Sequence, residues 1–249
     1  YDPNKNFFAQ MKELQLKAPF MSKIVGTSTL INSEYVNHSG HCKDCYLIYN
    51  ADKCENVYYS SDIVNVRDSS DCMLVGPAEL LYNSIGGGGS SNVYFSKNCT
   101  KSVNVWYSKE CIGCTNCFGC VNLRKKTYCI YNKSYTKEEY FKKIKEMELD
   151  KYSSHVKIQE TIYDFWNKFP YRYVHGRMNI NVTGDHVVNS KNAKECYRSQ
   201  KVEDSAYCQL ITMPTFHDSY DITEWGNGVE LSIEGITIGD GVSGAKYCS

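Results

Sequence analysis

A repeat of twelve residues is the feature that most limits what this chain can fold into. Six consecutive three-residue motifs begin at residues 58, 70, 82, 94, 106 and 118, and each has Ser or Cys as its third residue. No insertion or deletion interrupts the series. A fixed, uninterrupted period is typical of proteins that stack identical structural units.

Within this register, every third residue is small or aliphatic. One such column runs Ile48, Ser60, Cys72, Ser84, Ser96, Ser108 and Cys120, and the other three hold only Cys, Ser, Ala, Val, Gly, Ile and Leu between residues 42 and 123. An α-helix would repeat its apolar face every 3.6 residues. A closed coil of short strands matches the pattern, so we predict a mainly β fold: a parallel β-helix (solenoid) with about twelve residues per coil over residues 24–132.

Twelve residues enclose little space, which explains why Phe, Tyr and Trp are absent from these columns. The pattern resembles the coil of the beetle antifreeze solenoid, which also turns small residues inward at every third position. Ice binding in that family rests on an outward threonine ladder. The outward columns here carry mainly Asn and aromatic residues, so the resemblance implies a coil geometry and not that activity.

Segments outside this array have helical spacing. Apolar residues between positions 7 and 16 predict a helical cap within residues 1–23, which would cover the open end of the solenoid. Thr136 and Glu139 form a capping-box pattern, which predicts a helix over about 136–149. A weaker helical pattern ends before Pro170. We therefore predict a helical insert over residues 133–176.

Solenoid character returns after the insert. Cys196 and Cys208 are twelve residues apart, and small residues occupy every third position from Val187 until the register slips. We predict a second, less regular β-solenoid segment over residues 177–249, truncated within its array. Because the chain begins with Tyr1 rather than Met, we also expect it to be a piece of a longer protein.

Charge and hydropathy argue against some partners. The 28 Lys and Arg residues equal the 28 Asp and Glu residues, so the net charge does not support binding to nucleic acid. No stretch approaches the roughly 18 apolar residues that a membrane span requires. We predict a soluble protein without a membrane partner.

The chain contains 13 cysteines, and one group has metal-ligand spacing: Cys111, Cys114, Cys117 and Cys120. Four thiolates in such a run could hold zinc or an iron–sulfur cluster. The same spacing is that of the four inward positions of one coil, so we favour a role in the core, without a cofactor, and keep zinc as the alternative. Cysteines six apart on a coil, or twelve apart on neighbouring coils, could also form disulfides, and the sequence leaves their redox state open.

One outward column carries aromatic residues: Tyr58, Tyr82, Tyr94, Trp106 and Phe118. Such a strip is either covered by another part of the same protein or exposed as a platform for a partner. We favour coverage, and we retain these residues as candidates for a binding face. Protein partners or a larger assembly would fit such a face, and a glycan is a further candidate.

Several stretches are distinctive, above all CFGCVNLR at residues 117–124 and YTKEEY at residues 135–140. They resemble a group of cysteine-rich repeat proteins from large bacteriophages and candidate-phylum bacteria. The resemblance spans most of the chain. It implies an origin and an architecture, and it assigns no catalytic residue.

No catalytic motif is recognisable in the sequence, so we favour a non-enzymatic function. The first hypothesis is a structural or binding solenoid, for example a structural, decoration or adhesion component of a phage virion. The second is a zinc or iron–sulfur protein that uses the run from Cys111 to Cys120. The third is a carbohydrate-binding or carbohydrate-active β-helix that uses carboxylates and aromatic rings outside the core.

Overall fold

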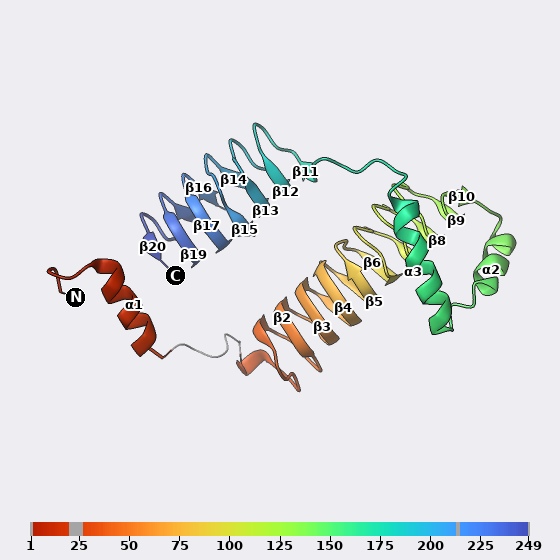
Figure 1. Cartoon of the computed structure of the whole chain (residues 1–249), viewed down its shortest axis with the longest axis horizontal. Coiled ribbons are helices and arrows are strands. Elements are labelled where there is room, and N and C mark those ends of the chain that lie inside the picture. Colours follow the sequence, from red (N-terminus) through yellow and green to blue (C-terminus); the bar gives the residue numbers. More distant parts are fainter. Residues whose placement is uncertain (1, 20–26, 213–214, 249) are drawn as a thin grey trace. The chain divides into compact units, whose positions relative to one another are not determined.

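The computed structural model describes residues 2–19, 27–212 and 215–248. The chain divides into two compact units, residues 1–169 and 170–249. Each unit contains its own stack of short parallel strands, drawn in orange to green for the first and in teal to blue for the second (Figure 1). The predicted fold class, a mainly β parallel β-helix, is confirmed.

The first array forms one sheet whose strands lie in sequence order. All pairs are parallel except β9 with β10, and partners are twelve residues apart from Asn37 with Tyr49 to Thr115 with Thr127. The predicted twelve-residue coil is therefore confirmed. The strands described in this array are β1 (Asn37–Gly40), β2 (Tyr46–Asp52), β3 (Glu55–Val64), β4 (Val66–Val75), β5 (Ala78–Ile85), β6 (Ser90–Tyr94), β7 (Val103–Trp106), β8 (Thr115–Phe118), β9 (Thr127–Ile130) and β10 (Lys133–Ser134).

The tight turns of each coil depend on a left-handed backbone conformation at every third residue. From Asn32 to Leu74, each of these residues has φ between 44° and 60°. Each one directly precedes a residue whose side chain points inward. Non-glycine residues rarely adopt this conformation, and Asn and Asp tolerate it best. The outward Asn-rich column, which includes Asn56, Asn92 and Asn104, thus reflects backbone geometry.

Side chains bridge successive coils along this column. The Nδ2 group of Asn56 donates to Oδ1 of Asp68 over 2.9 Å, and Nδ2 of Asn104 donates to Oδ1 of Asn116 over 3.1 Å.

The glycine run stays in register as one coil. Gly87 has φ of 93°, and a Cβ there would lie 2.1 Å from the carbonyl oxygen of Cys99, so this coil requires glycine at that position.

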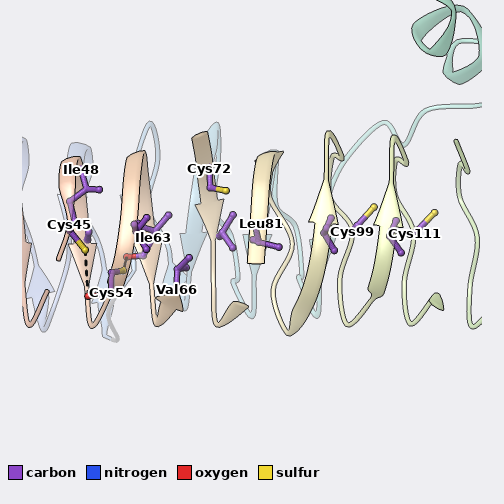
Figure 2. Packing of buried hydrophobic residues seen from close by; sticks show 14 of the residues in the cluster. Cys45, Ile48, Cys54, Ile63, Val66, Cys72, Leu81, Cys99 and Cys111 are labelled. Atoms are coloured by element: carbon purple, nitrogen blue, oxygen red, sulfur yellow. Dashed lines mark hydrogen bonds between the residues drawn. The ribbon is translucent and has the colours of Figure 1, made fainter. Parts of the chain in front are cut away.

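The core of the first array consists of the predicted inward columns. Figure 2 shows Cys45, Ile48, Cys54 and other members of this core inside the stack of coils. The serines pile one above another: Oγ of Ser96 donates to the carbonyl of Tyr94 and accepts from the amide of Ser108. No buried side-chain nitrogen or oxygen of the described residues lacks a partner. A polar core of this kind is tolerated because each hydroxyl is satisfied.

The second array has variable coil lengths. Partners are 11 residues apart for Gly176 with Val187, 12 for Gly184 with Cys196, 14 for Val202 with Phe216 and 13 for Phe216 with Val229. The strands described in this array are β11 (Gly176–Arg177), β12 (Gly184–Val188), β13 (Cys196–Gln200), β14 (Val202–Glu203), β15 (Gln209–Ile211), β16 (Phe216–His217), β17 (Tyr220–Trp225), β18 (Val229–Glu230), β19 (Ile233–Ile238) and β20 (Lys246–Cys248).

The predicted helices are present as α1 (Phe7–Lys17), α2 (Lys137–Glu146) and α3 (Tyr152–Trp166), and a short 3-10 turn, η1, covers Thr27–Thr29. The capping box is confirmed, because Thr136 and Glu139 each bond the backbone amide of the other. The α1 helix buries none of its residues. Residues 1 and 20–23 of the predicted cap, and residues 24–26 of the predicted solenoid, lie outside the described residues. Among the helices described, none has the length and apolar character needed to cross a membrane.

Candidate binding face and cysteine core

The five aromatic residues predicted to share an outward column lie above one another in the sheet. Tyr82 pairs with Tyr94, Tyr94 with Trp106, and Trp106 with Phe118, while Ser70 stands between Tyr58 and Tyr82. Their exposure falls along the column. The side chains of Tyr58 and Tyr82 are 40% and 42% exposed, whereas Phe118 is 1% exposed. The predicted coverage is thus correct for one end of the column only.

A second aromatic column lies beside the first, at the left-handed positions. We use the name aromatic ridge for both columns together: Tyr35, Tyr46, Tyr58, Tyr59, Tyr82, Tyr94, Phe95, Trp106, Tyr107, Phe118 and Tyr131. Rings contact each other along it, as in the stacked pair Phe95 and Tyr107, whose centroids are 4.7 Å apart. Ser70 and Asp71 interrupt the ridge between its two halves.

The α3 helix covers the half of the ridge that runs from Phe95 to Tyr131. Nε1 of Trp166 donates to the carbonyl of Tyr107 over 3.1 Å, and the ring of Phe165 lies 5.0 Å from that of Tyr131. Phe118, Ile162 and Trp166 belong to one buried cluster. Gly119 leaves room for this packing, since a Cβ there would lie 2.7 Å from the ring of Tyr131.

His155 fixes α3 to the ridge through a defined tautomer. Its Nε2 lies 2.8 Å from the carbonyl oxygen of Leu149, which can only accept, so Nε2 carries the proton. Its Nδ1 therefore accepts from the hydroxyl of Tyr107, at 2.6 Å. Burial raises the pKa of Tyr107 to about 12, so this hydroxyl is a donor at neutral pH. The sequence offered no signal for this pair, because 48 residues separate its members.

The cysteine run occupies the four inward positions of one coil, as we favoured. Cys111, Cys114, Cys117 and Cys120 are all at most 1% exposed. Their thiols donate to backbone carbonyls, for example Cys120 to the carbonyl of Phe118 over 3.3 Å. Among the described residues, no three of these sulfur atoms lie within 4.8 Å of one another. The run is a row of thiols around a coil and does not converge on one point.

Hydrogen bonding between neighbouring thiols divides the run into two kinds of thiol. It raises the pKa of Cys111 and Cys117 above the ordinary value, and burial adds to this rise. It lowers the pKa of Cys114 and Cys120, against the effect of burial. All thirteen cysteines, each within the described residues, are free thiols, and only Cys248 is exposed. The other twelve are small core residues whose thiols hydrogen-bond to the backbone.

A shallow depression on the first array bears on the carbohydrate hypothesis. It is lined by Asn65, Arg67, Ala78, Glu79, Gly89, Ser90, Ser91 and Val103. Among these described lining residues, Glu79 is the one carboxylate. Glycoside hydrolysis by the usual mechanisms needs a pair of carboxylates flanking the bond. The depression does not provide that pair.

No family model and no curated protein matches the sequence. Among solved structures, the chain is similar to a putative acetyltransferase from Desulfovibrio desulfuricans G20, with 10% identity over 85% of this chain and 61% of that one, at a TM-score of 0.15. It is also similar to the acetyltransferase domain of PglB from Neisseria gonorrhoeae FA1090, with 12% identity over 43% and 55% of the two chains, at a TM-score of 0.13.

A third similar structure is the Arabidopsis UDP-N-acetylglucosamine acyltransferase, with 10% identity over 90% of this chain and 66% of that one, at a TM-score of 0.15. The chain thus spans between about half and two thirds of the length of these three proteins. Superpositions this distant carry no argument about activity.

Proposed function

We propose that this chain is a non-enzymatic structural solenoid that assembles with further copies of itself. In this assembly the exposed half of the aromatic ridge, from Tyr35 to Tyr59, binds the α1 helix of a neighbouring copy. The observation that carries the proposal is the uneven coverage of the two halves of the aromatic ridge. A helix covers the half from Phe95 to Tyr131, and the other half has exposed rings.

The covered half supports a helix as the occupant. The α3 helix packs on the ridge with Ile158, Ile162, Phe165 and Trp166, which recur at helical spacing. In α1, Phe7, Phe8, Met11 and Leu14 recur at a similar spacing. Both helices therefore present one apolar stripe. An interface of the same kind, continued along the same ridge, would fit α1.

The exposure of both surfaces supports a second copy as the source of the helix. Phe8 and Leu14 are 70% and 64% exposed, and Tyr35 and Tyr59 are 61% and 56% exposed. Burial of one such Phe or Leu side chain contributes about 1.5–3 kcal/mol. An apolar helix and an apolar surface that both stay exposed in one chain can each bury the other in an assembly.

The test is the concentration dependence of the molecular mass, measured by sedimentation velocity on the chain under reducing conditions. We expect the wild-type chain to associate as its concentration rises. A ridge variant, Tyr58→Ser with Tyr59→Ser, and a helix variant, Phe8→Ser with Leu14→Ser, should each remain monomeric. Tyr207→Ser is the matched control, because Tyr207 is 53% exposed and has a left-handed backbone like Tyr59.

Mixing the two variants tests whether the α1 helix on the ridge comes from another copy or from the same chain. The ridge variant keeps an intact α1, and the helix variant keeps an intact ridge, so an equimolar mixture should restore a dimer that neither forms alone. A wild-type chain that stays monomeric at every concentration would overturn the proposal. Association that the ridge variant does not weaken would also overturn the proposal. That result is expected if α1 only caps the end of the solenoid, because the contact would then not involve the ridge.

The resemblance to phage proteins supports placing such an assembly in a virus particle, as a structural, decoration or adhesion component. Solenoids that add copies through one repeated contact suit extended particle surfaces. Mass spectrometry of purified phage particles that encode this sequence would test the placement. Detection of the chain at a fixed ratio to the capsid protein is expected, and its absence from intact particles would contradict the placement.

A further inference from the structure

The first coil of the second unit brings two histidines together. Its register is one residue shorter than that of the next coil, since Arg177 pairs with Val188 while Val188 pairs with Gln200. This shift of 11 residues places His175, just before β11, beside His186 in β12. Their rings stack with centroids 4.6 Å apart and an angle of 22°. A regular twelve-residue coil would not have paired these two positions.

Asp185 contacts Nδ1 of both imidazoles and is held by the backbone. Its Oδ1 accepts from the amides of both His175 and His186. Partial burial opposes ionisation, but these hydrogen bonds outweigh it and hold the pKa of the carboxyl below its usual value. The carboxylate is therefore charged at neutral pH and fixed in orientation.

The spacing of the three side chains fits a metal ion. Nδ1 of His175 lies 3.3 Å and 3.4 Å from the two oxygens of Asp185, and Nδ1 of His186 lies 3.0 Å from Oδ2. Tetrahedral zinc with bonds of about 2.0–2.1 Å separates neighbouring ligand atoms by about 3.3–3.4 Å. Among the described residues, this is the one group of three potential ligands whose donor atoms all lie within 4.8 Å of one another.

We propose that His175, Asp185 and His186 form a binding site for one zinc-class divalent cation. Two imidazole nitrogens and one carboxylate oxygen would supply three ligands, and the fourth position would be open to water. The side chains are 25%, 38% and 48% exposed in the order His175, Asp185 and His186, so an ion can reach them from solvent. On binding, each neutral imidazole carries its proton on Nε2 and coordinates through Nδ1.

This site differs in chemistry from the cysteine run, and the difference can be measured. Its ligands are nitrogen and oxygen, and those of the run would be sulfur. Cobalt(II) in place of zinc gives only weak visible bands with nitrogen and oxygen ligands, and it adds a strong near-ultraviolet charge-transfer band with thiolates. The proposal does not depend on the assembly through the aromatic ridge.

The experiment is a calorimetric titration of zinc chloride into the chelator-treated full chain under reducing conditions. We expect one ion per chain, and at least about tenfold weaker binding for His175→Ala, His186→Ala and Asp185→Asn. The asparagine variant keeps the oxygen that accepts from the two amides, so it separates loss of a ligand from loss of the fold. Cobalt(II) should give no thiolate band.

His217→Ala is the matched control, because His217 also lies in the second array, with its Nδ1 3.0 Å from Asp218 and its Nε2 3.3 Å from Glu230. This variant should bind zinc as the wild type does. Three results would overturn the proposal: no zinc binding by the wild type, equal binding by the Asp185→Asn variant, or a thiolate band with cobalt(II).

Discussion

The first array keeps one register of twelve residues throughout, whereas the second changes between 11 and 14. The cores differ in the same way. Among the described residues, the core of the first array contains no aromatic ring, while Phe216 is 1% exposed within the core of the second. The comparison indicates that the volume of the inward side chains and the length of the coil are matched.

The largest expected effect follows from removing the ring that the longer coils enclose. Phe216→Ala should lower the free energy of unfolding of the second unit by about 4 kcal/mol, because it leaves a cavity in a closed coil. Hydrogen exchange measured by mass spectrometry on peptides from residues 170–249 would give this value. The exposed Tyr207→Ala is the control, and a loss below about 1 kcal/mol for Phe216→Ala would contradict the match between core volume and coil length.

Adding a ring to the shorter coil tests the same relation in reverse. Ile63→Phe should destabilise the first array by about 3 kcal/mol, since a twelve-residue coil has no room for the ring. Ile222→Phe is the same change at an equally buried position of the second array and should cost only about 1 kcal/mol. The two values come from urea unfolding followed by hydrogen exchange. Equal costs in both arrays would refute the difference in interior volume.

The hydroxyls of the serine column give the next smaller effect. Ser96→Ala leaves the buried amide of Ser108 without its acceptor and should cost about 2 kcal/mol. Ser96→Cys should cost less than about 1 kcal/mol, because Cys72 and Cys120 occupy the same column and donate to the backbone as the serines do. Thermal unfolding of both variants would measure the difference. A cysteine variant as unstable as the alanine variant would show that the cysteines of the column are not equivalent to its serines.

The sequence predicted the first array because its signal is local and repeated. Small residues at every third position identify the interior, and the aromatic column could be read from the same register. The contact of Tyr107 with His155 could not be predicted, since it joins a coil to a helix whose docking depends on the shape of both surfaces. The pairing of His175 with His186 was missed for another reason: it depends on a coil one residue shorter than the expected period.

The smallest expected effect tests whether the two arrays share one backbone despite their different cores. Asn104 in the first array and Asn192 in the second are both left-handed, with φ of 54° and 49°, and each donates to the next coil. Replacement of either by Ala should cost about 1 kcal/mol, because alanine tolerates the left-handed conformation less well than Asn and cannot make the side-chain bond. The corresponding Gly variants should cost less. Equal losses of unfolding free energy, measured by urea unfolding, would mean that the two arrays differ only in their cores. A negligible loss at Asn192 would mean that the second array bends its coils by another means.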